Sequence, residues 1–228
     1  MTMTLGSKLI LRLSLGLILV AALLFIPAGS LRFWQAWAFL ALAFIPISLA
    51  FFYLYKHDPG LLARRLQTKE KVGEQKLLIR LLTPFFLVVF LLPGLDYRFG
   101  WSRIHFHMVP LWLMLMAQAL FLGGYFIVVW VLKVNSFAAH TIQVEPGQPV
   151  ISTGPYRLVR HPMYSGSILM WVSTPLVLGS FSALPLFALL VPFYVLRLLN
   201  EEKVLRQELP GYSEYCLRTR FRLVPFVW

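Results

Sequence analysis

The sequence has 228 residues, of which 59% are hydrophobic and only 13% are charged. Soluble domains have roughly 45–50% apolar and about 25% charged residues, so this composition excludes an ordinary soluble domain and indicates an integral membrane protein. The net charge of +12 is typical of cytoplasmic loops rich in Lys and Arg, and we find no nucleic-acid-binding motif. The single cysteine, Cys216, excludes an internal disulfide and CxxC metal sites; we expect a solvated thiol.

Four long apolar stretches predict membrane-spanning helices, each of which needs about 20 residues. The stretches cover residues 9–26, 34–55, 77–95 and 108–132. The first is expected to stop at Pro27 and Gly29, and it lacks a small-residue cleavage site, so we expect a retained helix. Pro84 and Pro93 are expected to kink or shorten the third helix.

Two shorter apolar runs follow at residues 163–178 and 183–199, joined by the sequence GSFS. Because each is near the lower length limit for a spanning helix, we expect a hairpin that crosses obliquely or only just reaches the far side. Within the fourth span, Gly123 and Gly124 are small residues of the kind that permit close helix contact. The sequence therefore predicts an all-α membrane bundle of five to six transmembrane helices that ends in a helical hairpin.

The distribution of positive charge predicts the orientation. With six crossings and both termini inside, only Arg32, Arg98 and Arg103 fall on the outer side, while all other Lys and Arg residues fall on the inner side. The positive-inside rule supports this topology, and a hairpin that does not cross leaves the count unchanged. In the charged inner stretch of residues 56–76 we expect an amphipathic helix on the anionic leaflet.

The densest polar cluster is GPYRLVRHPMYSG, residues 154–166. Gly154 favours a turn, and Pro162 suits the first turn of the next helix, where its missing N–H is not needed. Arg160 and His161 then lie beside a helix N-terminus, which can bind anionic or hydrogen-bonding ligand groups. Spacing alone favours the simpler interpretation, a basic anchor at the membrane surface with an interfacial tyrosine.

A second polar cluster follows the last apolar run. Arg197 and Glu201 are four residues apart, so they can pair on one helix face. Charges directly after an apolar span are costly unless they are paired or face a watery cavity. Because a hairpin returns to the side where it started, we expect Arg197, Glu201 and Glu202 to lie close to Arg160 and His161.

Other polar residues give weaker signals. His105 and His107 form an HxH pair, but no third ligand accompanies them, so we expect no metal site. His140 and Gln143 lie in the loop before the 154–166 cluster and are within reach of a ligand there.

As an ordered set, these motifs resemble the C-terminal signature of the isoprenylcysteine carboxyl methyltransferase (ICMT) family, which the related phospholipid methyltransferases share in looser form. The resemblance covers residues 133–228 and includes the sequence NSF at 135–137. The matching positions are Gly154, Tyr156, Arg160, His161, Pro162, Tyr164, Gly166, Glu201, Glu202, Tyr212, Tyr215 and Pro225.

The resemblance implies an integral membrane methyltransferase that uses S-adenosyl-L-methionine. Residues 133–228 would form the catalytic region with a cytoplasmic cofactor pocket, and residues 1–132 would provide the scaffold and the access route for an acceptor from the bilayer. All matching positions except Pro225 would then contribute to cofactor binding.

The resemblance also implies individual roles. His161 and the backbone near Pro162 would hold the cofactor, and Glu201 or Glu202 would contact its ribose or amino group. Arg197, with Arg160 or Arg218, would orient an anionic acceptor; the tail LRTRFRLVP departs from the family's Arg-Val-Pro, which leaves Arg218 the least defined. The catalytic candidates are therefore Arg197, Glu201, Glu202 and Arg160.

The resemblance implies an acceptor that is a lipophilic or small molecule with a carboxylate, amine or thiol group. A carboxylate needs no deprotonation, whereas an amine or thiol would need Glu202 or a tyrosine as a base.

Two other functions remain open. Sterol reductases that use NADPH share the motif more distantly, although the short loops leave little room for a pocket that binds a 2′-phosphate. A membrane scaffold without activity would not need a costly Arg–Glu–Glu cluster. In each case we expect an inner-membrane or endoplasmic-reticulum protein with both termini and the site on the cytoplasmic side, without metal or nucleic acid.

Overall fold

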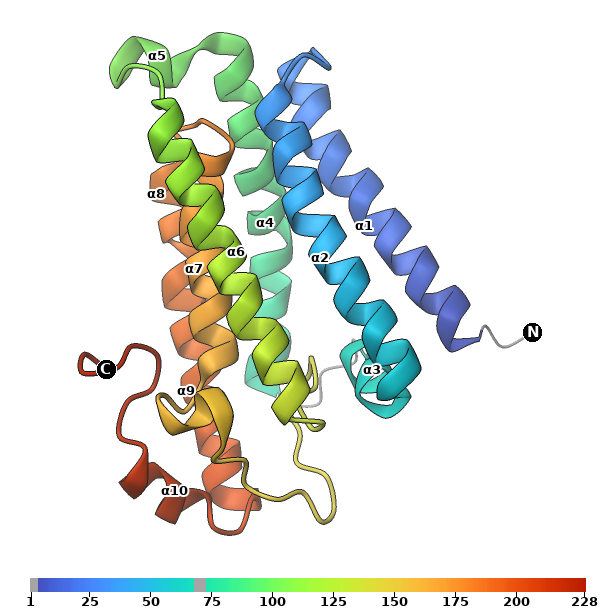
Figure 1. Ribbon diagram of the computed structural model, residues 1–228. Coiled ribbons are helices and arrows are strands. Elements are labelled where there is room, and N and C mark those ends of the chain that lie inside the picture. The colour runs from blue at the N-terminus through green and yellow to red at the C-terminus, as the bar shows by residue number, and fades with distance from the viewer. Residues whose placement is uncertain (1–3, 68–72) are drawn as a thin grey trace.

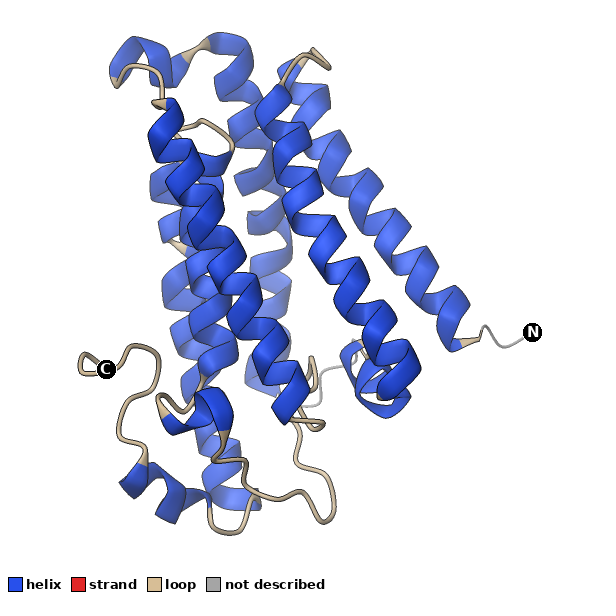
Figure 2. Ribbon diagram, in the orientation of Figure 1, coloured by secondary structure: helices blue, strands red, loops and turns tan. Residues whose placement is uncertain are grey.

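The computed structural model describes residues 4–67 and 73–228, and all the regular elements in these ranges are helices (Figure 2). In chain order they are α1 (Leu5–Ala28), α2 (Trp34–His57), α3 (Pro59–Arg65), α4 (Gly73–Phe99), α5 (Trp101–His105), α6 (Leu111–Val134), the 3₁₀ helix η1 (Gly154–Arg157), α7 (Pro162–Val177), α8 (Leu184–Ala188), α9 (Leu190–Glu208) and α10 (Tyr212–Arg218). The predicted all-α class is confirmed.

Five helical stretches in the described ranges are long and apolar enough to cross a membrane. They are α1, α2, the part of α4 from Ile79 to Phe99, α6, and α8 with α9 as one stretch, Leu184–Glu208; they run side by side along the bundle (Figure 1). The fifth predicted span, α7, has 16 residues, which gives a length of about 24 Å against about 30 Å for a bilayer core. The chain is an integral membrane protein with a polytopic helical bundle.

Prolines interrupt the helices less than the sequence predicts. Helix α1 continues through Pro27 and ends at Ala28, where Gly29 adopts a left-handed φ of 63° and donates its N–H to Phe25 and Ile26. Helix α4 continues through Pro84 and Pro93, so it is not shortened, and the alternative that these prolines kink it stays a prediction. Packing against neighbouring helices lets membrane helices tolerate proline, because other groups satisfy the freed backbone carbonyls.

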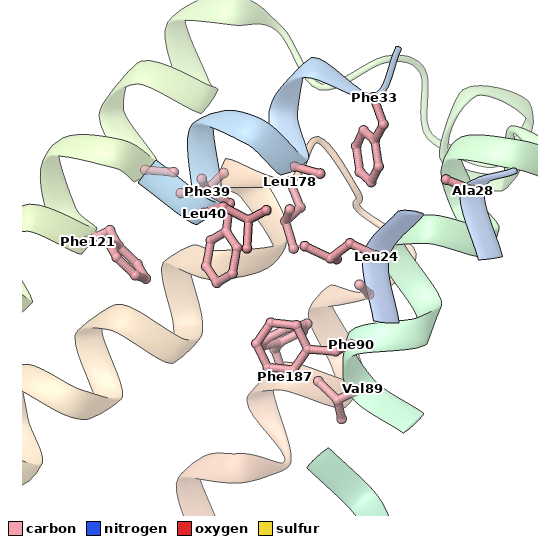
Figure 3. Packing of buried hydrophobic residues seen from close by; sticks show 14 of the residues in the cluster. Leu24, Ala28, Phe33, Phe39, Leu40, Val89, Phe90, Phe121, Leu178 and Phe187 are labelled. Carbon is pink, nitrogen blue, oxygen red and sulfur yellow. The ribbon is translucent and has the colours of Figure 1, made fainter. Parts of the chain in front are cut away.

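An aromatic core holds the middle helices together (Figure 3). The rings of Phe90 on α4 and Phe187 on α8 meet edge to face with centroids 5.7 Å apart, and Phe39 on α2 meets Phe121 on α6 at 5.6 Å. Leu24 of α1 and Phe187 are fully buried. Edge-to-face pairs add to the dispersion energy of close packing, so this cluster fixes the frame on which the other end of the bundle is built.

The turn between α7 and α8 reaches the end of the bundle where α4 passes into α5. Buried Asp96 accepts hydrogen bonds from the backbone N–H of Ser102 at 2.7 Å and from the hydroxyls of Ser102 and Ser180. The N–H of Ser182 donates to Ser102 Oγ at 3.0 Å. The hairpin therefore extends to the far end of the bundle although α7 is short.

Helices α6 and α7 cross at a contact between two glycines. A Cβ atom on Gly124 would lie 2.6 Å from the carbonyl oxygen of Gly166, and one on Gly166 would lie 2.7 Å from that of Gly124. Only residues without a side chain let two helix backbones approach so closely. The close contact expected of the glycine pair in α6 is thus confirmed at Gly124, whereas a Cβ on Gly123 would touch only Leu169, at 3.9 Å.

We predict that Gly124→Ala lowers the free energy of unfolding by about 1–3 kcal/mol, because the added methyl group forces two backbones apart. Gly123→Ala is the matched control and should be neutral or slightly stabilising, because alanine favours the helix. Thermal unfolding of both variants in the same detergent measures the difference. Equal midpoints would show that the crossing does not depend on Gly124.

Candidate functional site

A cavity of about 380 Å³ lies where α6 ends, α7 begins and α9 continues beyond the start of α7. This volume falls in the range of small-molecule sites, roughly 300–1,000 Å³. Nine of the residues that match the family signature or were predicted beside it line the cavity: Tyr156, Arg160, His161, Pro162, Tyr164, Arg197, Glu201, Tyr212 and Tyr215. His140 and Gln143, which we expected within reach of a ligand, line it as well. The structure therefore brings both polar clusters to one cavity.

Four other predicted residues do not line the cavity. Gly154 has a φ of +57°, and a Cβ there would press on Trp130 and Val134, so its role is in the turn. Gly166 lies at the crossing of α6 and α7. Arg218 is exposed on α10, and Glu202 is buried behind the wall.

The start of α7 is fixed by the C-terminal tail. Helix α7 begins at Pro162 with His161 as its N-cap residue, as the sequence predicts. The backbone N–H of Arg160 donates to the carbonyl of Phe221 at 2.9 Å, and that of His161 donates to Arg222 at 3.0 Å. Because these bonds join two backbone segments, the tail determines where the Arg160 and His161 side chains point.

Glu202 connects three segments through its carboxylate. Its Oε1 lies 2.7 Å from Arg160 Nε and 3.3 Å from His161 Nε2, and its Oε2 lies 3.1 Å from Arg222 Nε. The predicted meeting of the two polar clusters is thus confirmed. Both oxygens of Glu202 are engaged and only 4% of the residue is exposed, so it is poorly placed to contact a ligand or to act as a base.

Tyr164 stands between Arg197 and Glu201. Its hydroxyl donates to Glu201 Oε2 at 2.6 Å and accepts from Arg197 Nε at 3.2 Å. The α7 side chain thus links Arg197 and Glu201, and the direct pair between them stays a prediction. Arg197 also donates from Nη2 to the carbonyl of His140 at 2.6 Å, which holds the loop after α6 over the cavity.

Three of the tyrosines that line the cavity, Tyr156, Tyr212 and Tyr215, have neutral hydroxyl groups. Asn135 Nδ2 donates to the Tyr156 hydroxyl at 2.7 Å, and the Tyr215 hydroxyl donates to the Tyr156 carbonyl at 2.8 Å. Burial raises the pKa of Tyr156 to about 12 and also raises the pKa of Tyr212 and Tyr215 above the ordinary value. These groups offer aromatic surface and hydrogen-bond donors but no base at neutral pH.

Cys216 is buried beside these tyrosines, 8% exposed, in a cluster with Leu209, Tyr212 and Tyr215. The expectation of a solvated thiol is therefore wrong, because α10 turns this face of the tail inward.

The sequence did not predict Arg65, which lines the cavity from α3. Asp58 caps α3 by accepting from the N–H of Leu61 at 2.8 Å, and Leu61 and Leu62 are fully buried against neighbouring helices. An amphipathic helix is present at 59–65 in the predicted stretch, but its apolar face packs inside the protein; residues 68–72 of the stretch lie outside the described residues. The sequence Asp-Pro-Gly at residues 58–60 indicates that a helix starts there, but it does not predict that Arg65 at the end of this helix faces the cavity.

His140 faces the cavity among positive charges. Burial, followed by the charges of Arg65, Arg197 and Arg12, lowers its pKa from 6.5 to about 4. The imidazole is therefore neutral at physiological pH and offers one hydrogen-bond donor and one acceptor.

Comparison with known proteins relates this cavity to a family. Residues 112–210 match the family model described as phospholipid methyltransferase. We call residues 112–210 the phospholipid methyltransferase segment because they are similar to this family. The resemblance predicted from the motifs is confirmed over these residues, whereas the N-terminal boundary predicted at residue 132 stays a prediction.

A curated relative also matches part of the chain. It is the Delta(14)-sterol reductase TM7SF2 of Mus musculus, which is 31% identical over 94 residues, or 39% of this chain. The match spans only 22% of the length of that reductase. The phospholipid methyltransferase segment supplies most of the cavity wall, from Asn135 to Leu209.

We predict opposite behaviour for the two adjacent glutamates. Glu202→Gln removes the charge that pairs with Arg160 and Arg222, and breaking a buried ion pair costs about 3–5 kcal/mol. Glu201→Gln keeps an acceptor for Tyr164, so it should cost roughly 1 kcal/mol or less. Equilibrium unfolding in detergent compares the two variants; equal losses would contradict the separation of roles.

We predict that His140 resists protonation. The unfolded chain takes up this proton near pH 6.5, but the folded protein does so only near pH 4. His140 therefore lowers the free energy of unfolding progressively as the pH falls from 6.5 to 4. NMR titration of labelled histidine, with His140→Gln to assign the resonance, measures this pKa. Titration near 6.5 would show that the imidazole is not enclosed among cations.

Proposed function

We propose that this protein is an integral membrane methyltransferase that binds S-adenosyl-L-methionine and methylates a lipophilic or small acceptor. One observation carries the proposal: the phospholipid methyltransferase segment forms most of the wall of the cavity. The proposal places the cavity and both termini on the cytoplasmic side, which the positive-inside rule supports.

The cavity residues fit this cofactor. Tyr156, Tyr212 and Tyr215 present aromatic faces suited to adenine, and the Glu201 carboxylate is suited to accept hydrogen bonds from ribose hydroxyls or an amino group. Thr141 lines the cavity, and its buried hydroxyl has no hydrogen-bond partner in the described part of the chain. Such an orphaned polar atom costs free energy unless a ligand completes it.

Methyl transfer depends more on the position of the two reactants than on acid–base catalysis by the protein. When bound, the cofactor supplies an electrophilic methyl group on a sulfonium. The protein must then align the acceptor in line with this group and exclude water. Tyr164 holds Arg197 and Glu201 in place for this alignment, and Phe193 with Leu82 gives the cavity an apolar side toward the bundle.

The geometry changes the candidates for a base. Glu202 is engaged behind the wall, and the tyrosines that line the cavity near Tyr156 keep their protons, so both earlier candidates are disfavoured. Glu201 and the neutral His140 remain for an amine or thiol acceptor. A carboxylate acceptor needs no base, and the positive side chains of Arg65 and Arg197 in the cavity favour it.

The rival function is an NADPH-dependent reductase, which the partial match to the sterol reductase favours. We expect purified protein in nanodiscs to bind S-adenosylhomocysteine and not NADPH in isothermal titration calorimetry. Glu201→Gln should weaken this binding about tenfold or more, because a hydrogen bond to a charged group contributes about 1.5–3 kcal/mol. Binding of NADPH without binding of S-adenosylhomocysteine would replace the proposal with the reductase.

A further inference from the structure

Arg65 reaches the cavity from outside the phospholipid methyltransferase segment. It is the last residue of α3, and its Nη1 lies 3.3 Å from the Ala139 carbonyl oxygen and 3.3 Å from Met163 Sδ. The preceding residue, Arg64, does not line the cavity and pairs with Glu145 at 3.5 Å. Of these two adjacent arginines, only Arg65 contributes to the wall of the cavity.

Arg65 has no negative partner in the described part of the chain, where no carboxylate oxygen lies within 4.0 Å of its guanidinium. Burial and then the nearby charge of Arg197 lower the pKa of Arg65. Removing a cation from water is costly unless an opposite charge compensates it. A ligand with a negative charge would supply that compensation.

The charges around the cavity are uneven. Its described lining contains the cations Arg65, Arg160 and Arg197, and the single carboxylate Glu201. Arg160 is compensated from behind by Glu202, and Glu201 accepts the hydroxyl of Tyr164. The described lining therefore carries more positive than negative groups, and Arg65 lies close enough to His140 to lower its pKa.

The chemistry of guanidinium indicates what the ligand offers. Arginine has five N–H donors in a planar fork that matches the two oxygens of a carboxylate. One nitrogen of Arg65 contacts Ala139 and Met163, so the other two nitrogens are not engaged in hydrogen bonds within the described residues.

We propose that Arg65 is an anion-binding residue of the cavity and takes the carboxylate of a bound ligand. The inference rests on the proposed function, which supplies two sources of this group: the amino-acid carboxylate of the cofactor and the carboxylate of an acidic acceptor. It adds to the site a residue that the family segment does not contain.

The first arm of the test measures cofactor analogues in full-length protein in nanodiscs. S-adenosylhomocysteine has the carboxylate, and 5′-methylthioadenosine lacks it. If Arg65 holds the cofactor, Arg65→Gln weakens the binding of S-adenosylhomocysteine at least tenfold and leaves the affinity for 5′-methylthioadenosine unchanged. Arg64→Gln is the matched control and leaves both affinities unchanged.

The second arm uses laurate and dodecanol, which share a chain length and differ in the carboxylate. If Arg65 holds the acceptor, wild-type protein prefers laurate, and Arg65→Gln loses this preference while its affinity for S-adenosylhomocysteine is unchanged. Arg65→Lys keeps the charge without the planar fork. It should therefore lose part of the S-adenosylhomocysteine affinity if Arg65 holds the cofactor, or part of the preference for laurate if Arg65 holds the acceptor. The same variant is measured in place of Arg65→Gln if Arg65→Gln does not fold.

Two results overturn the inference. One is an Arg65→Gln protein that matches the wild type for S-adenosylhomocysteine and for the laurate-to-dodecanol ratio. The other is an equal loss for S-adenosylhomocysteine and 5′-methylthioadenosine with that ratio unchanged, which indicates a packing role. Failure of the proposed function gives a different result, because wild-type protein then does not bind S-adenosylhomocysteine. In that case the comparison of laurate with dodecanol alone decides whether Arg65 binds a carboxylate.

Discussion

The site depends on the burial of the Glu202 carboxylate among cations. The carboxylate joins α9, the start of α7 and the C-terminal tail, which are distant in sequence, and it fixes Arg160 and His161 from behind. Successive helix residues point about 100° apart, so engagement of Glu202 toward the tail leaves Glu201 facing the cavity. The adjacent acidic residues thus have two roles: Glu202 holds the wall together, and Glu201 presents its charge to the cavity.

The space for the cavity arises because α7 is shorter than the helices α6 and α9 beside it. Helix α7 begins at Pro162, while α9 continues to Glu208 beyond the contacts that Glu201 and Glu202 make with the start of α7. The contact between Gly124 and Gly166 holds α7 tightly against α6. The short helix is therefore held along its partner, and the space next to its N-terminus is enclosed by the loop after α6 and by α10.

Hydrophobic runs were sufficient to predict the helices, and the return of a hairpin was sufficient to predict that Arg160 and Glu202 meet. Sequence spacing could not show that Tyr164 links Arg197 and Glu201, because this depends on how two helices face each other. It also could not place Arg65, since a basic residue after a short amphipathic helix fits a membrane surface as well as a cavity. Proline effects were overestimated because neighbouring helices supply packing that a single segment lacks.

The cavity wall has two origins. The phospholipid methyltransferase segment at residues 112–210 supplies most of it, while α3 and α4 contribute Arg65, Ile79 and Leu82 from a part of the chain outside that match. Chemistry common to a family can therefore be kept while selectivity changes, because residues before the segment can be exchanged without altering the buried Glu202 network. Under the proposed function, a chimera that joins this C-terminal segment to a different set of leading helices would inherit the reaction and acquire a new choice of molecule.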